Sequence, residues 1–343
     1  MSYSDISLIP SEVNNGVGKY NYAIQDVVDR VVSLPIFTSP IYGLVSEENW
    51  RVWSSNGIRP ILPRTVSLDL RLEGCQYTFS AFSLKEVNDC FLSGKRSSAG
   101  IFKICIDSGN GHDTKIFEVA QKLKSLYGPQ INLMGGNIGS PKVYGRYCNS
   151  GFDYVRVGMA SGSLVNIGKY GFYYPQASLL LEIMKSKNTS FIGKKHTKII
   201  ADGGIENPTD ILKAIALGAD YVMIGRDFMG LVEASGPIWK KEDGTQVENS
   251  EVLLKMTPSE LRELKLFREY YGNTHPHVKA LQGSKPDIHD WVSTGDCRRD
   301  DIKVTKRLED WMGELYECLC YGFTMAGATD WNSFKSNIKF VRI

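Results

Sequence analysis

The sequence predicts an α/β protein, a (β/α)8 TIM barrel with an insertion after its eighth strand and a helix that closes the chain. Eight short apolar runs recur through the first two thirds of the chain, and segments with helical periodicity separate them. Most of these runs lack the polar alternation of a half-exposed strand, which is typical of parallel strands covered on both faces. An open doubly wound sheet gives a similar pattern, but the count of eight favours the barrel.

The expected strands are short and evenly spaced. They cover residues 34–41, 59–64, 78–83, 102–107, 131–136, 154–159, 197–204 and 220–226. Between them, Thr114–Tyr127 has its apolar side chains on one helical face. Residues 208–217 form another expected helix, because Asn207 is suited to the N-cap, Pro208 to the first helical position and Gly218 to the end.

Residues 237–303 break this alternation and predict a lid or flap inserted into a single barrel domain of residues 1–343. Within the insertion only residues 258–270 have convincing helical periodicity, and residues 273–299 have as their alternative a surface excursion without fixed structure. Residues 305–325 then predict a closing amphipathic helix.

Composition excludes several classes of partner. A net charge of +2 over 343 residues gives no electrostatic reason to expect a nucleic acid or a membrane surface. The opening residues lack a charged and apolar leader, and no apolar run is long enough to span a bilayer. The seven cysteines are scattered and the five histidines do not cluster with them, so we expect reduced thiols, a cytoplasmic location and no metal site.

Glycine and small polar residues follow several of the expected strands, where a barrel places its active-site loops. The loop 158–167 has two glycines and three other small residues within six positions, so its backbone N–H groups are open to a phosphate. A flexible Gly/Ser loop is the alternative. Gly225 and Arg226 open the segment after the last strand and add amides and a guanidinium to the same corner.

A second glycine pair follows the seventh expected strand. Asp202 stands at the strand end, where its carboxylate can accept two hydrogen bonds from a ribose diol. Gly203 and Gly204 allow the backbone to approach a phosphate closely, and a plain tight turn is the alternative. Together these loops predict a nucleotide site at the barrel mouth.

The chain resembles the IMP dehydrogenase/GMP reductase family, with a layout more similar to GMP reductase, because no paired regulatory domain interrupts the barrel. The resemblance covers nearly the whole chain and rests on segments that occur in the family's order. These segments are residues 3–10, 104–112, 134–137, 157–163, 174–176, 200–204, 218–225 and 340–342.

The resemblance implies a purine nucleotide ligand, a nicotinamide cofactor (NADPH or NADH) and a homotetramer. It implies the phosphate at Ser163, Gly204, Gly225 and Arg226, the ribose at Asp202, the base near Met256, and the cofactor near Asp107, Asn110 and Gly111. For the last three residues, ordinary turn chemistry at a strand end is the alternative.

The chain departs from the family's pattern at the catalytic residues. The family's loop, Gly-Ser-hydrophobic-Cys-x-Thr, reads Gly162-Ser163-Leu164-Val165-Asn166-Ile167 here, so Val165 replaces the nucleophilic cysteine and Ile167 the threonine. Valine has neither a lone pair nor an acidic proton, which closes the covalent route. Tyr271 stands where the resemblance implies an acidic residue, with Glu269 close by, and either can supply a proton.

Three hypotheses follow from this departure. The first is an enzyme that acts on a purine or purine-like nucleoside monophosphate by altered, cysteine-independent chemistry. The second is a catalytically inactive nucleotide-binding sensor, inhibitor or partner subunit. The third, which Val165 disfavours, is an ordinary GMP reductase or IMP dehydrogenase.

Overall fold

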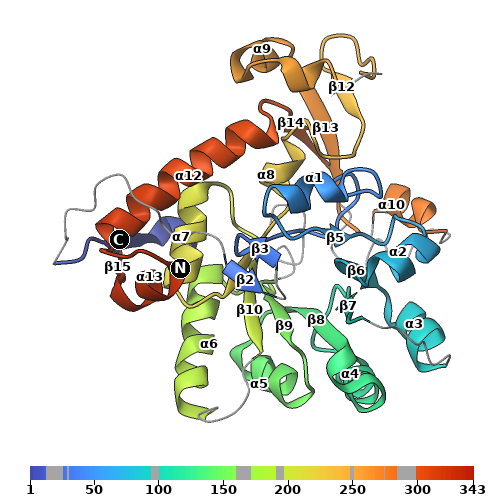
Figure 1. Ribbon diagram of the computed structural model, residues 1–343, viewed down its shortest axis with the longest axis vertical. Coiled ribbons are helices and arrows are strands. Elements are labelled where there is room, and N and C mark those ends of the chain that lie inside the picture. The colour runs from blue at the N-terminus through green and yellow to red at the C-terminus, as the bar shows by residue number, and fades with distance from the viewer. Residues whose placement is uncertain are drawn as a thin grey trace.

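The computed structural model describes residues 1–12, 26–28, 31–93, 100–159, 171–190, 197–247, 251–273, 275–283 and 299–343. Its centre is a parallel sheet of eight strands in the order β4-β11-β10-β9-β8-β7-β6-β5 (Figure 1). These strands are β4 (Ile36–Thr38), β5 (Ile61–Leu62), β6 (Phe79–Phe82), β7 (Phe102–Ile106), β8 (Ile131–Ile138), β9 (Tyr154–Val157), β10 (Lys198–Asp202) and β11 (Tyr221–Ile224). Each of the eight expected strands is therefore confirmed.

The sheet closes between β4 and β5, the two strands at its edges. Phe37 in β4 pairs in parallel with Arg59, two residues before β5. The Thr38 hydroxyl also accepts a hydrogen bond from the Ile61 backbone N–H at 2.9 Å. These contacts join the two edges of the sheet, and the (β/α)8 barrel that the sequence predicts is confirmed.

Helices cover the outside of the barrel between its strands. They are α1 (Trp50–Ser55), α2 (Leu68–Gly74), α3 (Leu84–Val87), α4 (Thr114–Tyr127), α5 (Pro141–Asn149), α6 (Gln176–Ser190), α7 (Pro208–Ala216) and α8 (Arg226–Met229). Helix α4 has the bounds that periodicity predicts. Helix α7 begins as its sequence predicts, because the Asn207 side chain accepts a hydrogen bond from the Asp210 N–H at 3.2 Å.

The barrel interior has its own apolar core. At the N-terminal ends of the strands, Phe37, Phe79, Tyr154 and Tyr221 are each at most 7% exposed, with ring centroids 5.3–5.9 Å apart. Most of these ring pairs meet edge to face, which is a favourable arrangement for aromatic quadrupoles. The rings fill that end of the barrel, so polar side chains inside it are found towards the opposite, C-terminal ends of the strands.

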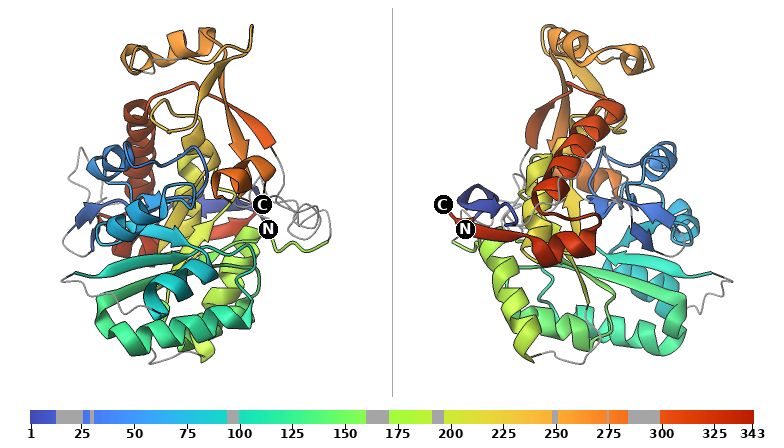
Figure 2. Two further views of the ribbon diagram at one scale, coloured as in Figure 1. Left: turned by 90° about the vertical axis from the view of Figure 1, so that its right-hand side faces the viewer. Right: turned by 60° about the vertical axis from the view of Figure 1, so that its left-hand side comes forward.

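The insertion contains a three-stranded antiparallel sheet in the order β12-β13-β14. Its elements are β12 (Ile238–Lys240), α9 (Pro258–Glu263), β13 (Leu266–Tyr271), α10 (Pro276–Leu281) and β14 (Arg299–Lys303). The sheet and α9 project away from the barrel body in the views of Figures 1 and 2. The lid role predicted for residues 237–303 stays a prediction.

The helix expected over residues 258–270 is wrong in its second half. Helix α9 ends at Glu263, and Lys265 has a φ of 49°, a left-handed conformation that interrupts the helix. The chain then enters β13, the central strand of the small sheet. Pairing with a strand on each side outweighs the helical spacing of the apolar residues.

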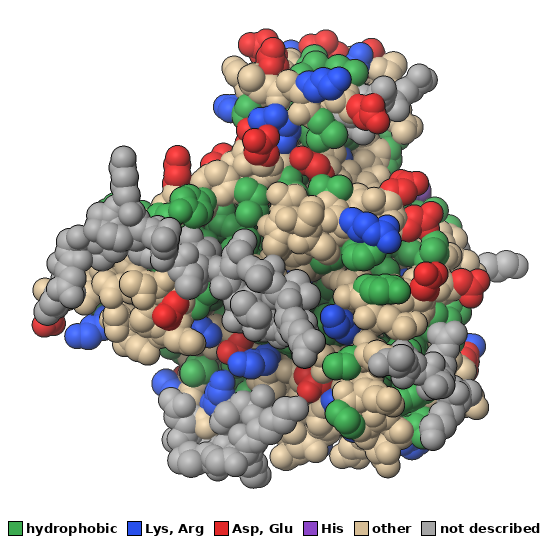
Figure 3. Space-filling model, viewed as in Figure 1, with side chains coloured by type: hydrophobic (Ala, Val, Ile, Leu, Met, Phe, Trp, Pro, Cys, Tyr) green, Lys and Arg blue, Asp and Glu red, His purple; other side chains and the backbone are tan. Residues whose placement is uncertain are grey.

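The remaining elements join the two ends of the described chain to the barrel. Strand β1 (Ile6–Ile9) pairs antiparallel with β15 (Lys339–Arg342), and β2 (Asp26–Val28) with β3 (Val31–Ser33). Helices α12 (Leu308–Met325) and α13 (Trp331–Asn337) follow the insertion. Helix α12 confirms the closing helix and begins three residues later than expected. None of the described helices has the length and apolarity needed to cross a membrane. On the face drawn in Figure 3, basic and acidic side chains are mixed.

Candidate functional site

Four polar side chains meet where β7, β8, β9 and β10 end. The Arg156 Nη2 group of β9 donates to the Asp107 Oδ1 atom at 2.9 Å. Beside this ion pair, the Asn137 Nδ2 group donates to the Asp202 Oδ2 atom at 2.6 Å and to the Gly158 carbonyl at 3.0 Å. Two carboxylates, one guanidinium and one amide thus form a polar layer above the apolar barrel interior.

The surroundings of Asp202 raise the pKa of its carboxyl group. Burial raises its pKa, and nearby Asp107 raises it further, whereas Arg156 and the Asn137 hydrogen bond partly oppose the shift. Burial therefore disfavours the charged form of the Asp202 carboxyl group, and hydrogen-bond donors from a ligand would stabilise that form. A diol that donates two hydrogen bonds is a suitable ligand for such a group.

The loop after β10 has the backbone geometry that the phosphate prediction requires. Gly203 and Gly204 have φ angles of 94° and 77°, which favour glycine over any residue with a Cβ atom. Nearby, a Cβ atom placed on Gly225 would lie 3.0 Å from the Tyr270 hydroxyl oxygen. The end of β13 thus reaches the corner at Gly225. Ser163, another of the expected phosphate contacts, lies outside the described residues.

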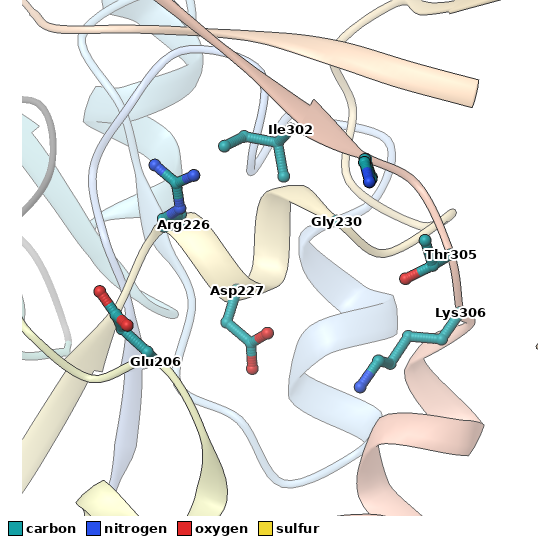
Figure 4. A pocket seen from close by; sticks show the side chains of 8 residues that line it. Glu206, Arg226, Asp227, Gly230, Ile302, Thr305 and Lys306 are labelled. Carbon is teal, nitrogen blue, oxygen red and sulfur yellow. The ribbon is translucent and has the colours of Figure 1, made fainter. Parts of the chain in front are cut away.

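The Arg226 side chain lines a hollow beside α8. Figure 4 shows Arg226 and Glu206 on one side of this hollow and Thr305 and Lys306 on the other. Arg226 is therefore next to the glycine corner through its backbone, and its side chain borders this hollow.

The cofactor positions implied by the resemblance divide into two groups. Asp107 belongs to the polar layer, and its Oδ2 atom accepts from the Asn273 Nδ2 group at 3.3 Å. In contrast, the Asn110 side chain accepts a hydrogen bond from the His112 N–H within its own loop. Gly111 contributes its N–H to the Asn137 carbonyl at 3.1 Å. Asn110 and Gly111 thus shape the loop, and Asp107 is the one of the three with a charged group at the mouth.

Asn273 ties the insertion to the barrel. Besides Asp107, its Nδ2 group donates to the Pro40 carbonyl at 3.2 Å, in the loop that follows β4. The end of β13 therefore lies across the rim between the loops after β4 and β7.

Tyr271 and Glu269, the expected proton donors, face the same side of β13. The Tyr271 hydroxyl donates to the Glu269 Oε2 atom at 2.7 Å. The Tyr271 ring lies 4.5 Å from that of His275, 4.9 Å from that of His277 and 6.2 Å from that of Tyr42. Burial, and secondarily the charge of Glu269, raise the pKa of Tyr42. A phenol and a carboxylate are thus coupled inside an aromatic cluster.

Four further positions bear on the predicted chemistry. Val165 and Ile167 lie outside the described residues. The Met256 side chain packs against the insertion's own apolar core with Leu261 and Leu266, not at the strand ends. Cys105 points into the barrel interior, fully buried, and burial raises the pKa of its thiol to about 12. Burial disfavours the thiolate, so Cys105 is poorly placed to replace the missing nucleophile.

Sequence reasoning missed Arg156, Asn137 and Tyr270. Arg156 was visible as the one charged residue in the apolar run of β9, because a buried charge needs a partner. Among the described residues its Nε atom has no hydrogen-bond partner, although the side chain is buried. No local pattern marks Tyr270, since the insertion brings it to the corner.

Comparisons with known proteins relate the chain to one family. The sequence model of the "IMP dehydrogenase / GMP reductase domain" matches residues 95–343. An inosine-5'-monophosphate dehydrogenase of Borreliella burgdorferi is 37% identical over 250 residues, which are 70% of this chain and 54% of that protein. A GMP reductase of Streptococcus agalactiae is 25% identical over 97% of this chain and 92% of its own length.

A third relative, GMP reductase 1 of Homo sapiens, is 33% identical over 139 residues, 40% of this chain and 39% of that protein. The chain thus spans about half or less of the length of the dehydrogenase and of the human reductase that it matches. The family match covers well over half of the chain and includes β7 to β11, whose ends carry the polar layer and both glycine loops. The chain therefore belongs to the IMP dehydrogenase/GMP reductase family.

Proposed function

We propose that this protein binds a purine or purine-like nucleoside monophosphate at the barrel mouth and acts on it as an oxidoreductase-derived enzyme without a cysteine nucleophile. The observation that carries the proposal is the polar layer of Asp107, Arg156 and Asp202 beside the glycine corner. In this assignment Asp202 accepts the ribose hydroxyls. Backbone amides of Gly203, Gly204, Gly225 and the Arg226 turn, with Ser163, take the phosphate.

A nicotinamide dinucleotide fits the Asp107 side of the mouth. The buried Arg156 Nε donor lacks a protein partner among the described residues, and the Asp107 carboxylate can accept from a sugar hydroxyl. NADPH or NADH would supply a hydride to the base. Asp107 would hold the cofactor ribose, with Asn110 and Gly111 shaping that wall.

Tyr271 and Glu269 supply the proton that such a reduction needs. Hydride addition to a C=N bond leaves a negative charge on nitrogen, and a nearby phenol can neutralise it. After the phenol has given up its proton, Glu269 can take up a proton from solvent and pass it to the Tyr271 phenolate across their hydrogen bond. Neither step uses a thiol, so valine at position 165 is compatible with this chemistry. We further propose a cytoplasmic homotetramer, as the family resemblance implies.

The second candidate is a nucleotide sensor or partner subunit without turnover. The loss of the nucleophile at Val165 and of the threonine at Ile167 favours it. Both candidate functions use the nucleotide site, but only the enzyme also needs a site for a nicotinamide cofactor. Binding of a nicotinamide cofactor to the nucleotide complex, followed by calorimetry, separates them, because a sensor has no use for that site.

The nucleotide site is tested by comparing a purine nucleoside with its 5′-monophosphate. We expect calorimetry to find tighter binding of the monophosphate, and Arg226→Ala to weaken it by about 1.5–3 kcal/mol through loss of a charge-assisted contact. Lys240→Ala, at an exposed lysine of β12, is the control and should leave the affinity unchanged. Equal affinity for nucleoside and nucleotide would contradict the phosphate assignment.

The altered chemistry is tested at Val165. GMP and IMP turnover with nicotinamide cofactors should be absent or many orders of magnitude below that of a cysteine enzyme. Val165→Cys alone should not restore it, because Ile167 and Tyr271 remain and groups that act as a unit are not additive. Cofactor absorbance assays on both proteins measure this. Robust GMP reduction by the wild type would instead establish an ordinary GMP reductase.

A further inference from the structure

Arg64 places a positive charge at the barrel mouth, on the side proposed for the cofactor. It follows the end of β5 by two residues, and 23% of its side chain is exposed. Strands β5, β6 and β7 are neighbours in the barrel and pair in parallel, so their carboxyl ends face the same way (Figure 1). Arg64 therefore lies at the same end of the barrel as Asp107, which directly follows β7.

The acid beside Arg64 takes its hydrogen bonds from other groups. This acid is Glu86, in the first turn of α3. The Arg71 Nη2 group donates to its Oε1 atom at 2.6 Å, and the Ser83 N–H and hydroxyl donate to its Oε2 atom at 2.7 and 2.9 Å. Burial opposes the charged form of Glu86, but the hydrogen bonds from Arg71 and Ser83 outweigh burial and lower its pKa. Glu86 is therefore a carboxylate whose two oxygen atoms both have donors.

The contact between Arg64 and Glu86 is long. The Arg64 Nε atom is 3.8 Å from the Glu86 Oε2 atom, which is an ion pair but too far for a hydrogen bond. The Nε atom is buried, and in the described part of the chain it has no hydrogen-bond partner. The guanidinium groups of Arg64 and Arg71 thus share one carboxylate, which leaves an excess of positive charge between them. An acceptor from an anionic ligand would satisfy the buried donor and balance this charge.

The two proposed ligands leave one direction for the far half of a nicotinamide dinucleotide. The nucleotide is assigned to the loops after β9, β10 and β11, and the cofactor ribose to Asp107 after β7. From β7 the barrel continues to β6 and β5, away from the nucleotide. Neighbouring strands lie about 4.8 Å apart, so the ends of β7 and β5 are separated by roughly 10 Å. A dinucleotide held at Asp107 would therefore extend its pyrophosphate and second ribose towards Arg64.

We propose that Arg64 binds the 2′-phosphate of the cofactor, so that the protein takes NADPH in preference to NADH. The inference rests on the cofactor site proposed above and names which of the two cofactors it takes. A guanidinium group can donate to two oxygen atoms of one phosphate, and a 2′-phosphate monoester carries more negative charge than either phosphate of the pyrophosphate. An arginine near the adenosine ribose accommodates this phosphate in other dinucleotide-binding folds.

The test is calorimetry with NADPH and NADH, on the protein alone and on the protein saturated with GMP. We expect NADPH to bind roughly tenfold tighter than NADH, because charge-assisted hydrogen bonds form only with the added phosphate. Equal or tighter binding of NADH would overturn the inference and leave the proposed function standing. If GMP binds and neither cofactor does, the cofactor site fails and the inference fails with it.

Variants locate the effect. Arg64→Met should lower NADPH affinity to that of NADH and leave NADH affinity unchanged, while Arg64→Lys, which keeps the charge but not the two-pronged donor, should retain part of the preference. Arg71 still pairs with Glu86 in both variants, so the fold should be retained.

The matched control is Arg51→Met, at an exposed arginine of α1, the helix before β5, which should change neither affinity. An NADPH preference that survives Arg64→Met would place the 2′-phosphate elsewhere and overturn the proposal. Equal weakening of both cofactors by Arg64→Met would place Arg64 at the pyrophosphate, which the two cofactors share, and would overturn it as well.

Discussion

The barrel mouth and the base of the insertion each contain a buried arginine, and the two are held in different ways. Arg156 at the mouth pairs with Asp107 and lies near Asp202. Arg268 in β13 is fully buried, and its hydrogen bonds go to backbone carbonyl oxygens of the segment 229–236. One arginine therefore balances titratable charges, and the other satisfies the main chain of a loop.

The pKa values of the two arginines shift in opposite directions, because the charges around each arginine oppose the effect of burial to different extents. Burial tends to lower the pKa of both guanidinium groups. For Arg156 the surrounding Cys105, Asp107 and Asp202 outweigh burial and raise the pKa. For Arg268 burial prevails and lowers the pKa to about 9, with only a small opposing effect of Glu233. Both remain cations at neutral pH, so the difference lies in what their loss would leave behind.

The largest expected effect is that of Arg268→Met on stability. The substitution leaves buried carbonyl oxygens of the segment 229–236 without donors, and we expect the free energy of unfolding to fall by about 3–5 kcal/mol. Urea denaturation measures it. Arg262→Met, at an exposed arginine of α9 in the same insertion, should stay within about 0.5 kcal/mol. A loss below 1 kcal/mol for Arg268→Met would mean that the segment 229–236 keeps its structure without the hydrogen bonds from Arg268.

A smaller loss, with a pH dependence, is expected for Arg156→Met. Without the guanidinium, Asp107 and Asp202 repel each other, and the already raised pKa of Asp202 rises further. A carboxyl whose pKa is higher in the folded than in the unfolded state stabilises the fold at low pH. That contribution is lost as pH rises through the folded-state pKa.

We therefore expect Arg156→Met to cost about 3 kcal/mol at pH 8 and clearly less at pH 5. Arg268→Met provides the contrast, because carbonyl oxygens do not titrate, so its cost should be similar at both values. Urea midpoints of the two variants and the wild type at pH 5 and pH 8 decide the matter. Parallel pH profiles for the two variants would show that the two arginines do not differ in the way described.

The smallest effect is expected where the two regions meet, at Asn273. Its hydrogen bonds to Asp107 and the Pro40 carbonyl are 3.2–3.3 Å long, and Asn273→Ala should cost about 0.5–1.5 kcal/mol. Amide hydrogen exchange should become faster at the end of β13 and stay unchanged in the segment held by Arg268. Faster exchange throughout that segment as well would mean that the regions unfold as one unit.

The barrel was predictable because its signals are local. Each strand is a short apolar run, and α4 and α7 carry their periodicity and caps within their own sequence. The strand β13 was not predictable in that way. Its residues fit a helical spacing, and only pairing with β12 and β14, distant in sequence, selects the extended form. Met256, which the resemblance implies near the purine base, packs against the insertion's apolar core, and its role in binding the base stays a prediction.

In the candidate site, too, the residues with local sequence signals were predictable, and those placed by distant contacts were not. Asp202, Gly203, Gly204 and Gly225 stand at strand ends, which follow directly from the barrel. Arg156 was overlooked within a strand although its charge was visible, because an apolar context suggested only packing. The fold of the insertion brings Tyr270 to Gly225, and no sequence pattern near Tyr270 predicts that contact.

The ring layer of Phe37, Phe79, Tyr154 and Tyr221 has a kinetic consequence. Because these side chains fill the N-terminal end of the barrel, the barrel is closed to ligands at that end. Molecules bound at the mouth must arrive and depart through the same opening. Where two ligands stack there, the deeper one arrives first and departs last, so the fold itself imposes an order on exchange.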